Sequence, residues 1–219
     1  MSDNQAAVSA VPRSRMKVAS FAAFAIATVF VIYAKNSQIF DPSSPIAQHF
    51  APARLFLIPH AIFASLALTL GVFQFSNRLR ARYLNVHKKL GYIYVVSVAI
   101  GGPTGILIAW TIGPKELFMA SVVQSFGWIV TTAIALYCVR IGNIAQHRRW
   151  MIRSYPFGAV FTVARLFVPL GLKLGGEAGL VQVVWTTIAL AAFLPSLLLE
   201  WQQIAARKPK ARTMAAKVA

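Results

Sequence analysis

Residues Leu117–Val139 read LFMASVVQSFGWIVTTAIALYCV, a run of 23 residues without one charged side chain. As a helix, a run of this length extends about 35 Å at 1.5 Å per residue, which is enough to cross the roughly 30 Å hydrocarbon core of a bilayer. The run is continuous and shows no alternation of apolar and polar residues. It therefore predicts a transmembrane helix rather than a strand of a membrane barrel.

Stretches of similar composition occupy most of the 219-residue chain. Hydrophobic residues make up 58% of the sequence and charged residues only 12%, whereas soluble domains carry about 25% charged residues, so the composition disfavours a water-soluble enzyme. We predict an all-α polytopic membrane protein, a six-transmembrane-helix bundle. Its spans are expected at Val18–Ala34, Pro59–Phe75, Leu90–Trp110, Leu117–Val139, Pro156–Leu174 and Leu180–Leu199. The connection Lys35–Ile58 holds Pro42, Pro45 and Pro52 and predicts an irregular surface loop.

The distribution of Lys and Arg predicts the orientation of the bundle. With the N-terminus inside, the inner segments hold 17 of the 22 basic residues and the outer segments hold four. Both termini are therefore predicted to be cytoplasmic, in a bacterial plasma (inner) membrane, with the basic residues facing anionic lipid. The predicted parts are a cytoplasmic tail (1–17), a membrane domain (18–200) and a basic cytoplasmic tail (201–219). The formal charge of +17 does not indicate nucleic acid, because almost no aqueous domain remains outside the spans.

Two inner loops lead into similar sequences, His87-Lys88-Lys89-Leu90 and His147-Arg148-Arg149-Trp150. Both histidines are predicted at the inner membrane level, at the starts of helices. Two neutral imidazoles that face each other across a bundle can ligate a haem iron, so His87 and His147 are candidate ligands of a haem b. Lys88 and Arg148 would then suit the haem propionates. The alternative is an interfacial basic cluster that holds lipid phosphates.

Three polar residues are predicted near the outer face. Arg165 lies about seven residues, or roughly 10 Å, below the outer end of its span, and Gln124 lies at a comparable depth. His60 opens its span at the same face. A cation inside a bilayer costs several kcal/mol unless it is paired or reaches a wet cavity. His60, Gln124 and Arg165 are therefore candidate lining residues of a substrate pocket, with Asp41, Glu116 or Glu177 near its mouth. The alternative for Arg165 is that its side chain reaches the outer surface.

No catalytic set can be identified in the sequence. No Ser/His/Asp arrangement, zinc-protease motif or nucleotide-binding fingerprint appears, and the five acidic residues are too scattered for paired-carboxylate chemistry. The single cysteine, Cys138, lies in an apolar run and is interpreted as a packing residue. Gly101, Gly102 and Gly105 are interpreted as sites where the third span bends or packs closely.

The chain resembles a family of bacterial membrane proteins known as DUF2306. The resemblance rests on His60, Gly71, Phe73-Gln74-Phe75, the block His87 to Tyr94, and His147-Arg148-Arg149-Trp150-Met151, and it covers roughly residues 55 to 170. It implies a membrane architecture rather than a particular reaction. A more distant likeness to the cytochrome b561 fold implies that His87 and His147 would bind one haem. The fourth span lacks the histidine that would pair with His60.

Three functions are open at this point. The first is electron transfer through one haem on the inner face, with a quinol or small reductant near His60 and Arg165. The second is a non-catalytic accessory or assembly subunit whose inner loops bind lipid or other membrane subunits. The third is a small-anion carrier that uses Arg165.

Overall fold

The computed structural model describes residues 12–207, and no strand occurs in that part of the chain. The predicted cytoplasmic tails lie in part outside the described residues. Helix runs through the rest of both predicted tails, because the first helix begins at Pro12 and the last ends at Arg207. The helices, in chain order, are α1 (Pro12–Phe40), α2 (Pro45–His49), the 3₁₀-helix η1 (Ala51–Ala53), α3 (Arg54–Gln74), α4 (Asn77–Arg82), α5 (Leu84–Ile112), α6 (Lys115–Arg140) and α7 (Ile144–Arg207).

Four helical segments among the described residues are long and apolar enough to cross a membrane, which supports the predicted membrane protein. They are Ala51–Gln74, Leu84–Ile112, Lys115–Arg140 and Ile144–Ala205. In α1 the apolar segment Ala25–Phe40 is shorter than these. The predicted count of six spans stays a prediction.

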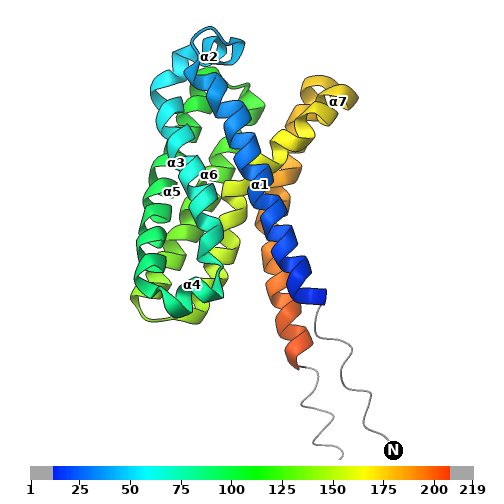
Figure 1. The fold of residues 1–219 in the computed structure, drawn as a ribbon. Coiled ribbons are helices and arrows are strands. Elements are labelled where there is room, and N and C mark those ends of the chain that lie inside the picture. The colour runs from blue at the N-terminus through cyan, green and yellow to red at the C-terminus, as the bar shows by residue number, and fades with distance from the viewer. Residues whose placement is uncertain (1–11, 208–219) are drawn as a thin grey trace, which may run out of the picture.

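Helix α7 contains two of the predicted spans and folds back on itself at Gly176 (Figure 1). Gly176 has φ 57° and ψ −138°, a conformation that a residue with a Cβ rarely adopts. Near the open ends of the two halves, Arg149 donates to Glu200 at 2.7 Å and Arg153 donates to Ser196 at 3.0 Å. The two halves therefore run antiparallel and side by side.

The segment between α1 and α3 is more helical than predicted. The predicted irregular loop Lys35–Ile58 contains the end of α1, all of α2 and η1, and the start of α3. Pro45 and Pro52 lie in the first turns of α2 and η1, where a missing N–H removes no helical hydrogen bond. The Ser44 hydroxyl accepts from the N–H of Ala47 and caps α2. The prolines thus start helices here, whereas the prediction treated them as helix breakers.

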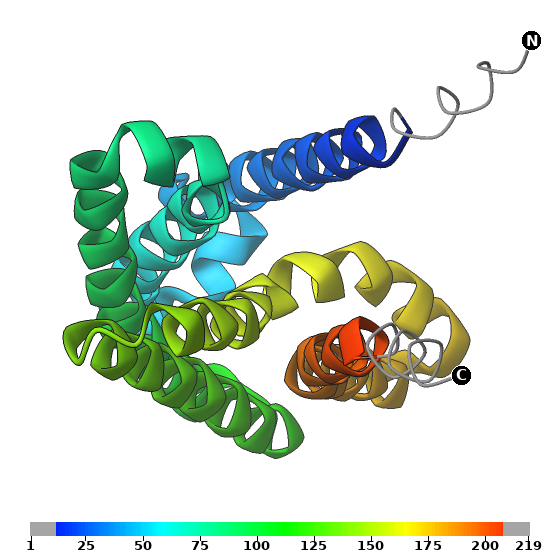
Figure 2. The same ribbon diagram turned by 90° about the horizontal axis from the view of Figure 1, so that it is seen from below.

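The connections are short and alternate between the two ends of the bundle. Helix α4 and the α6–α7 connection lie at one end, together with the start of α1 and the end of α7, whereas α2 and the Gly176 turn lie at the other (Figure 1). We call these the α4 end and the α2 end. Seen along the helices, the returning half of α7 lies at the edge of the bundle (Figure 2).

A closed ring of hydrogen bonds joins α5, α6 and α7 in the core. The Trp128 indole N–H donates to the Tyr94 hydroxyl at 3.0 Å, which lies 2.9 Å from the Ser154 hydroxyl. Ser154 lies 2.7 Å from the Thr132 hydroxyl, and Thr132 donates to the Trp128 carbonyl at 2.7 Å. Because Thr132 gives its single proton to that carbonyl, Ser154 must donate to Thr132 and Tyr94 must donate to Ser154. All four side chains are buried and satisfied.

Small residues let the helices approach closely, as the glycine pattern predicts. Gly101 and Gly102 are buried, and a Cβ added at Gly102 would lie 2.9 Å from Ile129 of α6. Cys138 is buried and forms no disulfide, in agreement with its interpretation as a packing residue. The core of the bundle lies where α3, α5, α6 and both halves of α7 meet.

Candidate functional site

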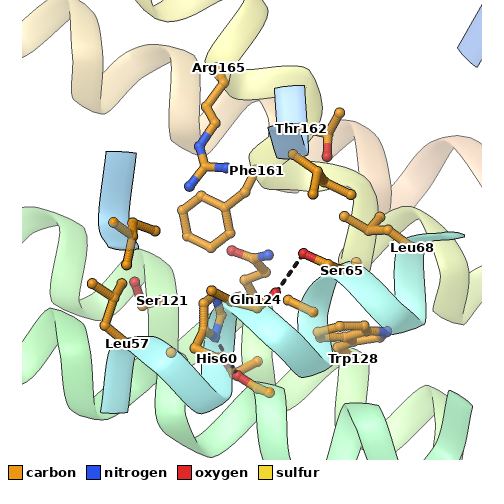
Figure 3. Close-up of a pocket in the computed structure, with 18 residues that line it drawn as sticks. Leu57, His60, Ser65, Leu68, Ser121, Gln124, Trp128, Phe161, Thr162 and Arg165 are labelled. Atoms are coloured by element: carbon orange, nitrogen blue, oxygen red, sulfur yellow. Dashed lines mark hydrogen bonds between the residues drawn. The ribbon is translucent and has the colours of Figure 1, made fainter. Parts of the chain in front are cut away.

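A cavity of about 60 Å³ lies among α1, α3, α5, α6 and α7, closer to the α2 end of the bundle. This volume holds several water molecules or a group of a few heavy atoms. His60, Gln124 and Arg165, the candidate pocket residues from the sequence, all line it (Figure 3). None of Asp41, Glu116 and Glu177 is among the residues that line it, and their place near its mouth stays a prediction.

His60 lies within the first two turns of α3, and its ring is held in one orientation. Its Nδ1 is 2.8 Å from the carbonyl oxygen of Gly101 in α5. A carbonyl oxygen only accepts hydrogen bonds, so Nδ1 must carry the hydrogen, and Nε2 of the neutral ring keeps a free lone pair. Gly105 makes room for the ring, because a Cβ at that position would lie 3.1 Å from Cε1 of His60. The ring also meets the Phe161 ring edge to face, with centroids 6.5 Å apart.

Gln124 contributes a buried amide from α6. Its side chain is 4% exposed, and its Nε2 donates to the carbonyl of Phe157 at 2.9 Å. Its Oε1 is buried and has no hydrogen-bond partner among the described residues. An unsatisfied buried acceptor costs about 1–3 kcal/mol, so this oxygen favours a bound group that supplies a donor.

Arg165 contributes the only permanent charge among the described residues that line the cavity. Its guanidinium lies beside the Phe161 ring on the side of the cavity that faces α7 (Figure 3). No described carboxylate pairs with it: the one acidic residue found in ion pairs, Glu200, binds Arg149 and Arg153. Arg165 is also close enough to His60 for its charge to act on the imidazole. The cavity therefore combines one cation, one neutral imidazole and several uncharged polar groups.

Four hydroxyl side chains complete the polar lining, and sequence reasoning missed them: Ser65, Ser121, Ser125 and Thr162. A readable signal existed in α6. Its buried residues recur every three or four positions, and several of them are polar within an otherwise apolar span: Ser121, Gln124, Ser125, Trp128 and Thr132. This spacing marks one helix face, and a polar face inside a membrane span indicates a cavity or a polar contact.

The second pair of predicted site residues lies near the α4 end. His87 is close enough to Arg80, His147 and Arg148 for their charges to act on it. Burial and the neighbouring Arg148 both lower the pKa of Arg80. Lys88 and Arg148 are exposed. The structure thus brings the two histidine-containing loops together into one basic cluster.

The two histidines of this cluster fit a haem unequally. Nδ1 of His147 donates to the carbonyl of Ala135 at 2.9 Å, which leaves Nε2 free, as in a histidine that ligates a metal. Nδ1 of His87 is buried without a hydrogen-bond partner among the described residues, so nothing fixes its tautomer. In the described part of the chain no group of three or more His, Cys, Asp or Glu side chains converges on a metal site.

Comparison with known proteins identifies a family and no reaction. The DUF2306 family, described as a predicted membrane protein, matches residues 57–204. This range includes every candidate site residue, from His60 to Arg165. No curated protein and no solved structure matches the chain, so the likeness to cytochrome b561 stays a prediction. The match spans more than half of the sequence, and the protein is therefore a membrane protein of the DUF2306 family.

Proposed function

We propose that the protein binds a small organic anion in the cavity lined by His60, Gln124 and Arg165. The observation that carries this proposal is Arg165, a guanidinium that lines an intramembrane cavity with no described carboxylate beside it. Arg165 is partly exposed at the surface of the bundle, and at its predicted depth a cation without a partner is costly in a membrane, so a bound anion offsets that cost. The uncharged polar groups around it orient the ligand.

The cavity favours a monocarboxylate over larger or more highly charged anions. A carboxylate matches the planar fork of a guanidinium and forms two parallel hydrogen bonds with it. One cation balances one negative charge, and about 60 Å³ suits a group of a few heavy atoms. A hydroxyl next to the carboxylate would give Gln124 Oε1 the donor that it lacks. Lactate is therefore a suitable probe, and propionate is its analogue without the hydroxyl.

The test is lactate binding to the purified full chain by calorimetry. We expect Arg165→Gln to weaken lactate binding roughly 10- to 150-fold, because a charge-assisted hydrogen bond is worth about 1.5–3 kcal/mol. The matched control is Arg54→Gln, since Arg54 is exposed at the α2 end of the bundle and does not line the cavity. Equal weakening in both variants, or no binding by the wild-type chain, contradicts the proposal. Uptake of labelled lactate into proteoliposomes then separates a carrier from a binding protein.

A second candidate function is electron transfer through a haem b at the α4 end. The hydrogen bond that leaves Nε2 of His147 free favours it. His147 and His87 would hold the iron, Lys88 and Arg148 would pair with the propionates, and the haem would supply one-electron chemistry. A reduced-minus-oxidised visible spectrum of protein expressed with ample haem tests this. A low-spin spectrum that is lost in His147→Ala supports it, and well-folded protein without such a spectrum removes it.

The setting we propose is a bacterial inner membrane, with both termini in the cytoplasm and the α4 end facing anionic lipids. The basic residues of the two histidine-containing loops support this orientation. Contacts with further membrane subunits belong to the same proposal, because an accessory role would use this basic surface.

A further inference from the structure

Among the described residues that line the cavity, only His60 can gain or lose a proton near neutral pH. Its Nδ1 hydrogen is used by the Gly101 carbonyl, so a further proton can bind only at Nε2. The groups that face the cavity from the other helices are apolar or uncharged, with one exception. Helix α1 contributes Ile32 and Ile39, α5 contributes two glycines, α6 contributes hydroxyls and an amide, and α7 contributes Arg165.

This arrangement makes the charge on His60 dependent on what is bound beside it. With the cavity empty of anions, a proton on Nε2 would place an imidazolium in the same cavity as the Arg165 guanidinium, with no described carboxylate in the lining to balance them. Two like charges that line the same cavity repel each other. A carboxylate bound to Arg165 removes this repulsion and offers the imidazolium a counter-charge. Anion binding and protonation of His60 therefore favour each other.

We propose that the cavity takes up its anion together with one proton, which binds to Nε2 of His60. The inference rests on the proposed anion site and adds its coupling to protons. The proton comes from water at the pocket mouth and adds to the Nε2 lone pair, while every covalent bond of the ligand stays intact. The charges of the anion and the proton cancel, so binding leaves the net charge of the cavity unchanged. The ligand class is thus a weak acid taken up as anion plus proton.

The test follows lactate binding by the full chain between about pH 5 and pH 8, where histidine titrates and lactate stays ionised. We expect the dissociation constant to rise with pH, by up to about tenfold per pH unit, because one proton binds with each anion. His60→Gln should still bind lactate but without this pH dependence. His49→Gln is the matched control and should keep it, since His49 is exposed and outside the cavity.

A second readout needs no variant. Lactate added to wild-type protein in weak buffer with a pH indicator should remove close to one proton from solution for each lactate bound. Binding that is independent of pH and takes up no proton overturns the coupling and leaves the anion site standing. An absence of binding at every pH overturns the anion site itself, so the two failures can be told apart.

Discussion

Gly105 of α5 has no side chain, and this leaves room for the imidazole ring of His60 on α3. The His60 ring lies close to the point where a Cβ of residue 105 would be, with Cε1 at 3.1 Å and Nδ1 at 3.3 Å from that point. These separations are shorter than ordinary van der Waals contacts, so any larger residue must displace the ring. The hydrogen bond from Nδ1 to Gly101 would lengthen as a result.

Gly105→Ala should therefore weaken lactate binding several-fold and lower the free energy of unfolding by about 1–3 kcal/mol, the usual range for overpacking. Calorimetry and thermal unfolding in detergent measure the two effects. Gly175→Ala is the matched control, because a Cβ there would meet nothing within 4 Å. If Gly105→Ala behaves like Gly175→Ala, the ring is not held where we describe it.

Gln124→Leu should separate stability from binding, because it should weaken lactate binding without lowering the free energy of unfolding by more than about 1 kcal/mol. Its Oε1 is buried and unpartnered, so Gln124→Leu removes an unsatisfied acceptor along with the bond to Phe157. We expect the free energy of unfolding to stay within about 1 kcal/mol of wild type, or to rise. Lactate binding should fall to the level of propionate binding, since the hydroxyl loses its acceptor. A large loss of stability would show that the amide is structural.

That His60, Gln124 and Arg165 line one cavity was predictable, whereas the contacts that surround each of them were not. Counting from the predicted span ends at 1.5 Å per residue places Gln124 and Arg165 roughly 10 Å or more inside their spans and His60 at the start of its span, all at the same end of the bundle. The partners of each residue depend on which helix faces which. The Gly101 carbonyl that holds His60 belongs to a helix 41 residues further along the chain, and no local pattern encodes that contact.

At the scale of elements, the hydrogen-bonded ring joins α5, α6 and α7 at a single level. Each of its four side chains donates to the next group and none is left unpaired. Tyr94 links Trp128 to Ser154, so its hydroxyl is the member whose removal leaves a buried indole N–H without an acceptor. Buried polar networks of this kind stabilise one packing arrangement only when complete.

Tyr94→Phe should lower the free energy of unfolding by about 1–3 kcal/mol, the cost of one unsatisfied buried donor. Thermal unfolding of the purified protein measures it. Tyr137→Phe removes the same hydroxyl from an exposed position on α6 and should have little effect. Equal free energies of unfolding for the two variants would contradict the role of the hydrogen-bonded ring in stability.

The positions of the helices could be predicted from the sequence where apolar runs were long. The prediction was wrong between α1 and α3, where a loop was expected and α2 and η1 occur. Long uncharged runs such as Leu117–Val139 allow only a helix in lipid, so α3, α5 and α6 were readable. A proline breaks a helix when it lies in the interior but is tolerated in the first turn, and Pro45 and Pro52 lie in first turns. Deciding between these two roles requires the position of the cap at Ser44, which composition does not reveal.

At the scale of the whole molecule, the predicted orientation concerns the two ends of the bundle. We expect a fluorescent protein fused to the C-terminus to fluoresce in the cytoplasm, and alkaline phosphatase inserted after Gly176 to be active outside it. Alkaline phosphatase inserted after Gly142, at the α4 end, is the control and should be inactive. The reverse pattern would invert the bundle and place the cavity near the cytoplasm.

Trp128 connects the hydrogen-bonded ring of α5, α6 and α7 to the cavity. Trp128 lines the cavity on one side. Its indole N–H donates to the Tyr94 hydroxyl, and its indole is packed against Gly158. A solute that passed this level would have to break several buried hydrogen bonds, each worth about 0.5–1.5 kcal/mol, so passage would be slowed by orders of magnitude. Along this route, an anion bound at the proposed site would leave by the mouth through which it came, and in a carrier of such an anion the opening rate of the hydrogen-bonded ring would limit the rate of transport.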